Sequence, residues 1–543
     1  MERLRSFAAL AAALFLLSCG QGRKPLSQLD SQPLSADEKL LDLDVAFSHF
    51  KKYYAPLQYK EKTLGVKYDD VFAQLRAEAA ASTTDQEFFD VLGKLVDSFK
   101  DGHVSVSIPG MARYSLPFSL DYFDGHYVVV DVKSDFSAET GVVKGDELTK
   151  IDGRSPSEIA SKILEFRSFG YDRADQRFAA YQLTHRSHVV PTSNQAYLDF
   201  KRASDGAQYN IMAFWKKESG IAAESSGAHF RSEITDASIL LFGENTPFFY
   251  TDKARTAFNF VKVGVTEEQW HDAGEEGKPF DLFALLYRHE GKNVLLIRIP
   301  TYSINDADLK RNVRTYELLL KSYSNLADVL VIDQTHNPGG SVEYVEELAR
   351  LFMKRPGPSF AFAPRADRLW LRFVDKILTT PELPTTTRQY FNNVYREIDA
   401  ANERSDFLAP QIALTRTTNT IVENTAWTKP VLLLIDELCG SGGDGFPMIM
   451  KGNDAAKLFG HRTAGMGGNV DSVPALPNTG ATFQLTRSLF YLATSDGSLP
   501  DTAIIENNGV TPHIERSYGY ADFQDGFAKY VKHFSDAAIG LGQ

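Results

Sequence analysis

Cysteine is scarce in this sequence, since Cys19 and Cys439 are the only two among 543 residues. So few thiols exclude a disulfide framework, and no clustered His and Cys set or HExxH motif is present to bind zinc. We therefore expect neither a metal nor another cofactor. Basic residues are fewer than acidic ones, with 58 Lys and Arg compared with 70 Asp and Glu. The net charge of −12 argues against nucleic acid as a partner.

The apolar run near the N-terminus, Phe7–Leu17, is too short to cross a bilayer as a mature helix. Two arginines precede it, and it ends in a Leu-Leu-Ser-Cys sequence that resembles a bacterial lipobox, with cleavage before Cys19 and acylation of its thiol. We expect a lipoprotein signal peptide at 1–18 and a tether at 19–35. A plain secretory signal is the alternative. By analogy with enterobacterial sorting, Gly20 favours the outer membrane of a Gram-negative envelope.

The length of the chain predicts two to four domains, and its apolar periodicity suggests where they lie. Helix-spaced apolar residues come first, short alternating strands follow, and strands then alternate with helices as in a parallel α/β layer. We expect a helical domain at 36–110, a β domain at 112–216, an insertion or linker at 217–290, and an α/β core at 291–535 with an insertion at 354–428.

The β domain resembles a PDZ domain, and its most specific part is the GDELTKIDG turn at 145–153. Residues 166–191 would be an insertion relative to a compact PDZ domain. Such domains take a peptide end by adding a strand to a sheet edge. The resemblance therefore implies polypeptide partners, captured by their C-terminal ends.

A glycine-rich turn within the core carries one hydroxyl. The buried strand Val431–Ile435 leads to Gly440-Ser441-Gly442-Gly443, and a helix can start at Asp444. A tight strand-to-helix turn exposes a serine nucleophile, and the amides opening the helix can receive negative charge on an oxygen. A structural turn is the alternative. A P-loop would need a Gly-Lys-Ser/Thr ending, and a nucleophile elbow would need glycine in place of Cys439.

A second turn, Asn337-Pro338-Gly339-Gly340, follows the buried strand Val329–Asp333. It offers backbone amides at the carboxyl end of a parallel strand, where the sites of open α/β sheets gather. A serine also needs a base and a group that orients this base. Of the twelve histidines, His103, His336 and His461 belong to tight motifs.

Five motifs in order resemble the C-terminal processing (tail-specific) serine peptidases, and more closely the catalytic core of tricorn-type peptidases. The resemblance covers most of the chain from about residue 36 to 520, with insertions at 217–290 and 354–428. The motifs are Asp101-Gly102-His103, Asp333-Gln334-Thr335-His336-Asn337-Pro338-Gly339-Gly340, Gly440-Ser441-Gly442-Gly443-Asp444-Gly445-Phe446-Pro447, Gly460-His461-Arg462-Thr463-Ala464-Gly465 and Glu506-Asn507-Asn508-Gly509-Val510-Thr511-Pro512.

The two branches of this family differ in the base. One branch uses a lysine, but Met466 stands at its place here, and a thioether cannot accept the proton. The tricorn-like branch uses a histidine after the N-terminal helices and a glutamate before Gly-Val-x-Pro, which correspond to His103 and Glu506. Gly102 departs from the family pattern, because tricorn has a serine there. His513 also departs from it, in place of an aspartate.

The resemblance implies Ser441 as nucleophile, His103 as general base, and Glu506 as the acid that orients the base, directly or through a hydroxyl. It also implies an oxyanion hole from the amides of Gly442 and one of Gly339 or Gly340.

We therefore expect a multidomain α/β protein with an N-terminal helical domain, a PDZ-like β domain and a ClpP/crotonase-like parallel core. The leading functional hypothesis is a lipid-anchored cell-envelope serine endopeptidase. Two alternatives remain open: a non-catalytic protein that binds a peptide or apolar ligand, which the 12% aromatic content motivates, and a serine esterase or glycan hydrolase.

Overall fold

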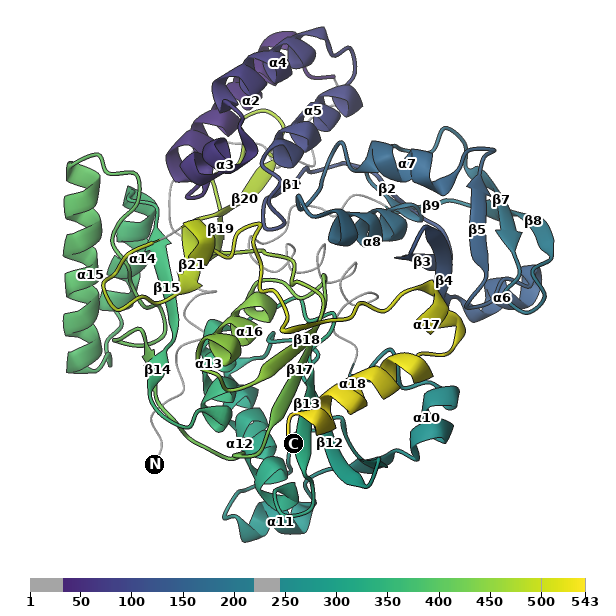
Figure 1. The fold of residues 1–543 in the computed structure, drawn as a ribbon. Helices are drawn as coiled ribbons and strands as arrows, with labels where there is room; N and C mark the ends of the chain where they lie inside the picture. The colour runs from purple at the N-terminus through teal and green to yellow at the C-terminus, as the bar shows by residue number, and fades with distance from the viewer. Residues whose placement is uncertain (1–32, 219–244, 500, 543) are drawn as a thin grey trace.

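The computed structural model describes residues 33–218, 245–499 and 501–542 (Figure 1). Cys19 and almost all of the expected signal peptide and tether lie outside the described residues. Within the described ranges, no helix is long and apolar enough to span a membrane.

Four helices form the N-terminal domain. Capping boxes start two of them, because Ser35 and Thr84 each exchange hydrogen bonds with a glutamate three residues later. Their apolar faces enclose a core that also takes in Phe483 and Leu485 from the far end of the chain. The helices are α2 (Ala36–Tyr53), α3 (Leu57–Leu64), α4 (Tyr68–Ala81) and α5 (Asp85–Ser98).

A short three-stranded sheet ties this domain to the catalytic core. Strand β1 (Ser105–Ser107) pairs with β20 (Thr482–Thr486), which pairs in turn with β19 (Val470–Ser472), all antiparallel. Figure 1 shows β19 and β20 beside the N-terminal helices. This pairing places β1, which follows α5 in the chain, beside two strands from the C-terminal part of the chain.

The PDZ-like domain has a five-stranded sheet in the order β3-β4-β5-β7-β8. The helix α8 (Asp172–Gln182), from the expected insertion, packs against the edge strand β3, and Arg177 on α8 pairs with Asp121 on β3 at 2.6 Å. The strands are β3 (Phe118–Phe123), β4 (His126–Val132), β5 (Glu147–Ile151), β7 (Gln195–Lys201) and β8 (Gln208–Phe214), accompanied by helices α6 (Ser134–Thr140) and α7 (Pro156–Ile163). The short strands β2 (Arg113–Ser115), β6 (His185–Arg186) and β9 (Lys216–Glu218) form a separate sheet.

The catalytic core is built on a seven-stranded mixed sheet in the order β10-β11-β12-β13-β17-β18-β22. The run from β12 to β22 is parallel, whereas β10 and β11 are antiparallel. The strands are β10 (Val261–Val263), β11 (Ala284–His289), β12 (Lys292–Arg298), β13 (Val329–Asp333), β17 (Val431–Ile435), β18 (Lys457–Gly460) and β22 (Ile514–Glu515).

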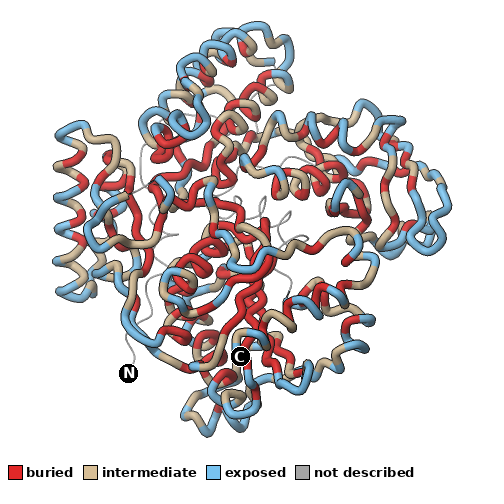
Figure 2. Tube along the Cα trace, viewed as in Figure 1, coloured by how far each residue is buried: buried red, intermediate tan, exposed pale blue. Residues whose placement is uncertain are grey.

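Helices cover both faces of this sheet, which explains why β13 and β17 are buried throughout, apolar except for Asp333, and lie in the buried centre of Figure 2. Alternate strand residues, such as Leu433 and Leu434, enter opposite cores. One face packs against α12 (Asp306–Tyr323), α13 (Val342–Ala349) and α16 (Gly442–Gly452), and the other against α18 (Ala528–Gly540). The predicted fold class is confirmed.

The range 217–290 differs from the expected linker, because β10 and β11 within it extend the core sheet. β11 pairs with β12, and β10 pairs with β11 at the edge of the sheet. Helices α10 (Asp252–Phe258) and α11 (Glu267–Asp272) accompany them. The 354–428 insertion joins the core through β15 (Phe360–Pro364), which pairs with β21 (Ser488–Leu492). It also contains α14 (Arg368–Leu378), α15 (Thr385–Glu403), β14 (Gly357–Pro358) and β16 (Thr420–Ile421).

Candidate active site

Ser441 lies in a sharp turn between the buried strand β17 and the helix α16. Its backbone angles, φ 56° and ψ −115°, are rare for a residue other than glycine, and strain of this kind gathers at functional sites. The neighbouring glycines permit the turn, since a methyl group on Gly443 would lie 2.2 Å from the carbonyl oxygen of Asn337. The local sequence therefore places the serine hydroxyl at the carboxyl end of β17.

The two glycine-rich turns touch beside Ser441. A methyl group on Gly339 would lie 2.6 Å from the Gly442 amide nitrogen and 2.7 Å from Ser441 Cβ. The Gly339 amide already donates to Asn337 Oδ1 at 2.9 Å. Within the described ranges, the amides of Gly340 and Gly442 donate to no acceptor. These two donors are therefore the ones available to a developing oxyanion, which favours Gly340 over Gly339.

His103 is held in a tight turn at the end of the N-terminal domain. Asp101 Oδ1 accepts from the His103 amide at 2.8 Å, and Asp101 Oδ2 accepts from Tyr54 and Thr486 hydroxyls, each at 2.8 Å. The His103 ring nitrogen Nδ1 lies 3.4 Å from the carbonyl oxygen of Gly467. With Nδ1 facing a carbonyl, Nε2 is the nitrogen left to act as a base. Burial lowers the pKa of His103, against the attraction of Asp101.

Met466 brings the histidine and serine turns together. A methyl group on Gly102 would lie 2.8 Å from Met466 Cγ, and one on Gly440 would lie 2.7 Å from Met466 Sδ. The residues preceding His103 and Ser441 therefore contact the same thioether side chain. In the part of the chain that the structure describes, no hydrogen bond joins the His103 ring to Ser441. The two turns are therefore linked through their shared contact with Met466.

Glu506 reaches His103 through a backbone group rather than through a hydroxyl. Its Oε2 accepts from the Gly467 amide at 3.1 Å, and the Gly467 carbonyl faces the His103 ring. Its Oε1 pairs with Lys60 Nζ from α3. Burial raises the pKa of Glu506 to about 8, and Asp101 adds to this while Lys60 opposes it. The sequence did not indicate Lys60 or Gly467, because neither stands in a motif and both roles depend on tertiary packing.

The other candidate histidines lie elsewhere. His336 Nε2 is 3.0 Å from Asp436 Oδ2 and 2.6 Å from the Tyr518 hydroxyl, and the ring borders a cavity of about 260 Å³ between the PDZ-like domain and the core. His461 Nδ1 lies 3.2 Å from Glu515. His336 is therefore a hydrogen-bonded residue of the domain boundary, and neither histidine is tied to the Ser441 turn by a hydrogen bond among the described residues.

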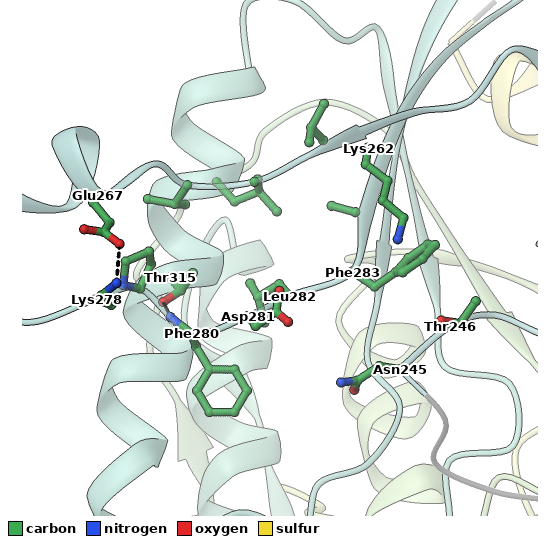
Figure 3. A pocket seen from close by; sticks show the side chains of 16 residues that line it. Asn245, Thr246, Lys262, Glu267, Lys278, Phe280, Asp281, Leu282, Phe283 and Thr315 are labelled. Atoms are coloured by element: carbon green, nitrogen blue, oxygen red, sulfur yellow. Dashed lines mark hydrogen bonds and ion pairs between the residues drawn. The ribbon is translucent and has the colours of Figure 1, made fainter.

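A cavity of about 570 Å³ lies at the edge of the core sheet, between β10 and α12, where Lys262, Phe283 and Thr315 line it (Figure 3). Its lining includes none of the serine, histidine and glutamate discussed above. The one group of residues in the described ranges with spacing suited to a metal ion is His289, Glu290 and Asp536, whose ligand atoms lie within 4.8 Å of one another. None of these three is a residue of the serine site.

Comparison with known proteins agrees with this architecture. Residues 293–516 match the model of peptidase family S41, and residues 112–221 match a PDZ domain model. An uncharacterized protein of Chlamydia muridarum is 26% identical over 576 residues, which cover 93% of each chain. The structure of mature CPAF complexed with lactacystin superposes with a TM-score of 0.75 at 22% identity, over 93% of this chain and 99% of that chain. The crystal structure of mature CPAF gives a TM-score of 0.72 at 23% identity, over 93% and 98%.

The likeness to CPAF shows a shared fold, and the family match shows the enzyme class. The protein is a serine-type peptidase with a PDZ domain. The match to peptidase family S41 covers residues 293–516, which hold most of its catalytic core.

Proposed function

We propose that the protein is an endopeptidase that cleaves polypeptides through an acyl-enzyme on Ser441. One observation carries the proposal: the strained Ser441 turn lies beside two amides without acceptors, and the residue before Ser441 contacts the same Met466 side chain as the residue before His103. A purely structural turn requires neither the strain nor the free donors. The Ser441 hydroxyl, the His103 ring and the two amides together supply a nucleophile, a base and an oxyanion hole.

In the proposed reaction, His103 Nε2 takes the proton of Ser441 Oγ as this oxygen attacks the scissile carbonyl. The amides of Gly442 and Gly340 hold the resulting oxyanion. The protonated imidazole then gives its proton to the leaving amine, the peptide bond breaks, and an ester on Ser441 remains. Water, deprotonated by His103, hydrolyses the ester. The lowered pKa of His103 keeps the imidazole neutral near pH 7, as a base must be.

A fluorophosphonate probe tests the nucleophile. We expect it to modify the peptide that contains Ser441 and to stop cleavage of an unfolded protein substrate, whereas Ser441→Ala is neither modified nor active. Modification of a different serine, or labelling that persists in Ser441→Ala, contradicts the assignment. Lactacystin, which is bound in one CPAF structure, serves as a second probe of the same site.

The PDZ-like domain is the proposed docking place for extended polypeptide ends. Helix α8 lies against β3, but β8 at the opposite edge pairs only with β7 among the described strands. Met212 and Phe214 on β8 are 43% and 56% exposed, so a peptide strand could add there. We expect substrates with a free C-terminal carboxylate to have a lower KM than their amidated counterparts. Equal KM values would contradict capture by the C-terminal end.

Anchoring through Cys19 completes the proposal and places the peptidase in a Gram-negative cell envelope, at the outer membrane. It rests on the lipobox-like sequence. Mass spectrometry of the N-terminal peptide should find an acylated Cys19 at the start of the mature chain. Cleavage at a different bond, with an unmodified cysteine, would refute the lipid anchor.

A further inference from the structure

Lys60 on α3 has a fully buried ammonium group. Its Nζ contacts Glu506 Oε1 and Asn507 Oδ1, and it donates to the carbonyl oxygen of Lys100 at 2.9 Å. A buried ammonium is destabilising unless its charge is paired and its protons are hydrogen-bonded. All three protons have an acceptor here. Lys62 on the same helix offers the contrast, since its side chain is 69% exposed and pairs with Asp501 at the surface.

The carboxylate of Glu506 links Lys60 to the base of the proposed site. Oε1 faces the ammonium, while Oε2 accepts from the Gly467 amide at 3.1 Å. The carbonyl oxygen of Gly467 lies 3.4 Å from His103 Nδ1. The path from ammonium to imidazole therefore leaves the N-terminal domain at Lys60, passes through Glu506 and Gly467 of the core, and returns to the N-terminal domain at His103.

The charge state of Glu506 determines whether the hydrogen bonds along this path can form. As a carboxylate it only accepts hydrogen bonds, which suits both the ammonium and the Gly467 amide. A protonated carboxyl carries an O–H donor, which needs an acceptor and cannot bond to either of these donors. Burial and the nearby Asp101 raise the pKa of Glu506 to about 8, and Lys60 acts in the opposite direction. The titratable groups facing this carboxyl are Lys60 and Tyr59 from α3, Tyr54 after α2, Tyr68 from α4, Asp101 and, through Gly467, His103.

We infer that Lys60 is a positioning residue of the peptidase site, whose ammonium favours the carboxylate form of Glu506 against the effect of burial and thereby orients Gly467 and the His103 ring. The inference rests on the proposed function, because it gives Lys60 a role only if His103 acts as the base. It also gives the N-terminal helical domain a direct part in the site.

The test measures the rate of fluorophosphonate modification of Ser441 between about pH 6 and pH 10 in the full-length protein. The variants are Lys60→Met, Lys60→Gln, Glu506→Gln and the double variant Lys60→Met with Glu506→Gln. Lys62→Met serves as the matched control on the same helix. Lys60→Gln retains hydrogen-bonding capacity without the charge, so it substitutes for Lys60→Met if the latter does not fold. Circular dichroism reports whether each variant is folded.

Removing an opposite charge at contact distance shifts the pKa of a carboxyl by about 1–3 units. We therefore expect Lys60→Met and Lys60→Gln to move the rising limb of the rate profile by at least about one unit towards high pH. Near pH 8 the rate should fall about fivefold or more and recover at higher pH. Lys62→Met should keep the wild-type profile. In the Glu506→Gln background, the loss of Lys60 should change the rate less than about threefold, because the two residues act as one unit.

An unshifted profile in a folded Lys60 variant overturns the inference, and so do effects of Lys60→Met and Glu506→Gln that multiply. These outcomes leave the proposed function intact, provided that the wild type is modified at Ser441. A wild type that is not modified at any pH overturns the proposed function and this inference with it.

Discussion

Replacing Gly339 with alanine would put a methyl group against the turn that holds Ser441 and the Gly442 amide. This methyl would lie 2.6 Å from the Gly442 amide nitrogen, 2.6 Å from the Gly440 carbonyl oxygen and 2.7 Å from Ser441 Cβ, whereas ordinary contacts begin at 3.4 Å. The two turns must therefore separate by about 0.8 Å to relieve the contact. An oxyanion donor has to lie roughly 2.7–3.1 Å from the oxygen, so a displacement of this size removes its hydrogen bond.

The expected loss follows from the number of donors displaced. Removal of one oxyanion donor lowers kcat by about 10²–10³, which corresponds to about 2.7–4 kcal/mol of transition-state stabilisation. Gly339 also has φ +98°, which alanine adopts only with strain. This strain costs about 1–3 kcal/mol of folding free energy and should lower the midpoint of thermal unfolding. The rate effect and the stability effect are thus measured separately.

The assay compares fluorophosphonate modification and peptide cleavage in wild type, Gly339→Ala and Gly264→Ala. Gly264 is the matched control, because a methyl group there meets nothing within 4 Å and its φ lies outside the left-handed range. Circular dichroism at the assay temperature establishes that each variant is folded. If folded Gly339→Ala keeps activity within about threefold of wild type, the oxyanion hole does not lie between these two turns.

Three further predictions concern the core of the site. Ser441→Gly should unfold at a higher temperature than Ser441→Ala, by about 1–2 kcal/mol in stability, because φ 56° is strained for alanine and not for glycine; equal melting temperatures would show that the turn relaxes. Burial raises the pKa of Asp444 from 3.8 to about 6, so the folded state binds this proton more tightly than the unfolded state does. About 3 kcal/mol of the free energy of unfolding is therefore lost as the pH rises from about 4 through 6. Asp444→Asn should flatten thermal stability between pH 4 and pH 7, and an unchanged slope contradicts this. Cys439 is buried, which raises the pKa of its thiol, so peptide mass spectrometry should find it alkylated only after unfolding; rapid alkylation of the native protein would be the contrary result.

The parts of the fold that follow from local sequence were predictable. The apolar run Val431–Ile435 and the glycines after it specify a buried strand and a sharp turn, and the structure places β17 at those residues. Helix-spaced apolar residues such as Leu309, Val313 and Leu320 likewise indicate the helix α12, Asp306–Tyr323. The strands β10 and β11 could not be predicted, because their pairing with neighbouring strands, β10 with β11 and β11 with β12, rather than the β-propensity of their short sequences makes them strands.

The site was predictable only where a motif marked it. His103 and Ser441 stand in glycine-containing turns, whereas Lys60 lies in an ordinary amphipathic helix and is distinguished only by burial against Glu506. Glu506 was expected to orient His103 directly or through a hydroxyl, whereas the contact runs through the backbone of Gly467, and no pattern in one sequence encodes such a contact. Similarly, the resemblance left Gly339 and Gly340 equivalent, and the hydrogen bond from the Gly339 amide to Asn337 distinguishes them.

The most direct test of the account is the cleavage rate of the double variant Ser441→Ala with His103→Ala, compared with each single variant. A nucleophile and its base act as one unit, so each single loss should lower kcat by several orders of magnitude, up to about 10⁶, and the second loss should add almost nothing. The account predicts that the double variant equals the single variants. Losses that multiply, or a folded His103→Ala that cleaves at the wild-type rate, would contradict it.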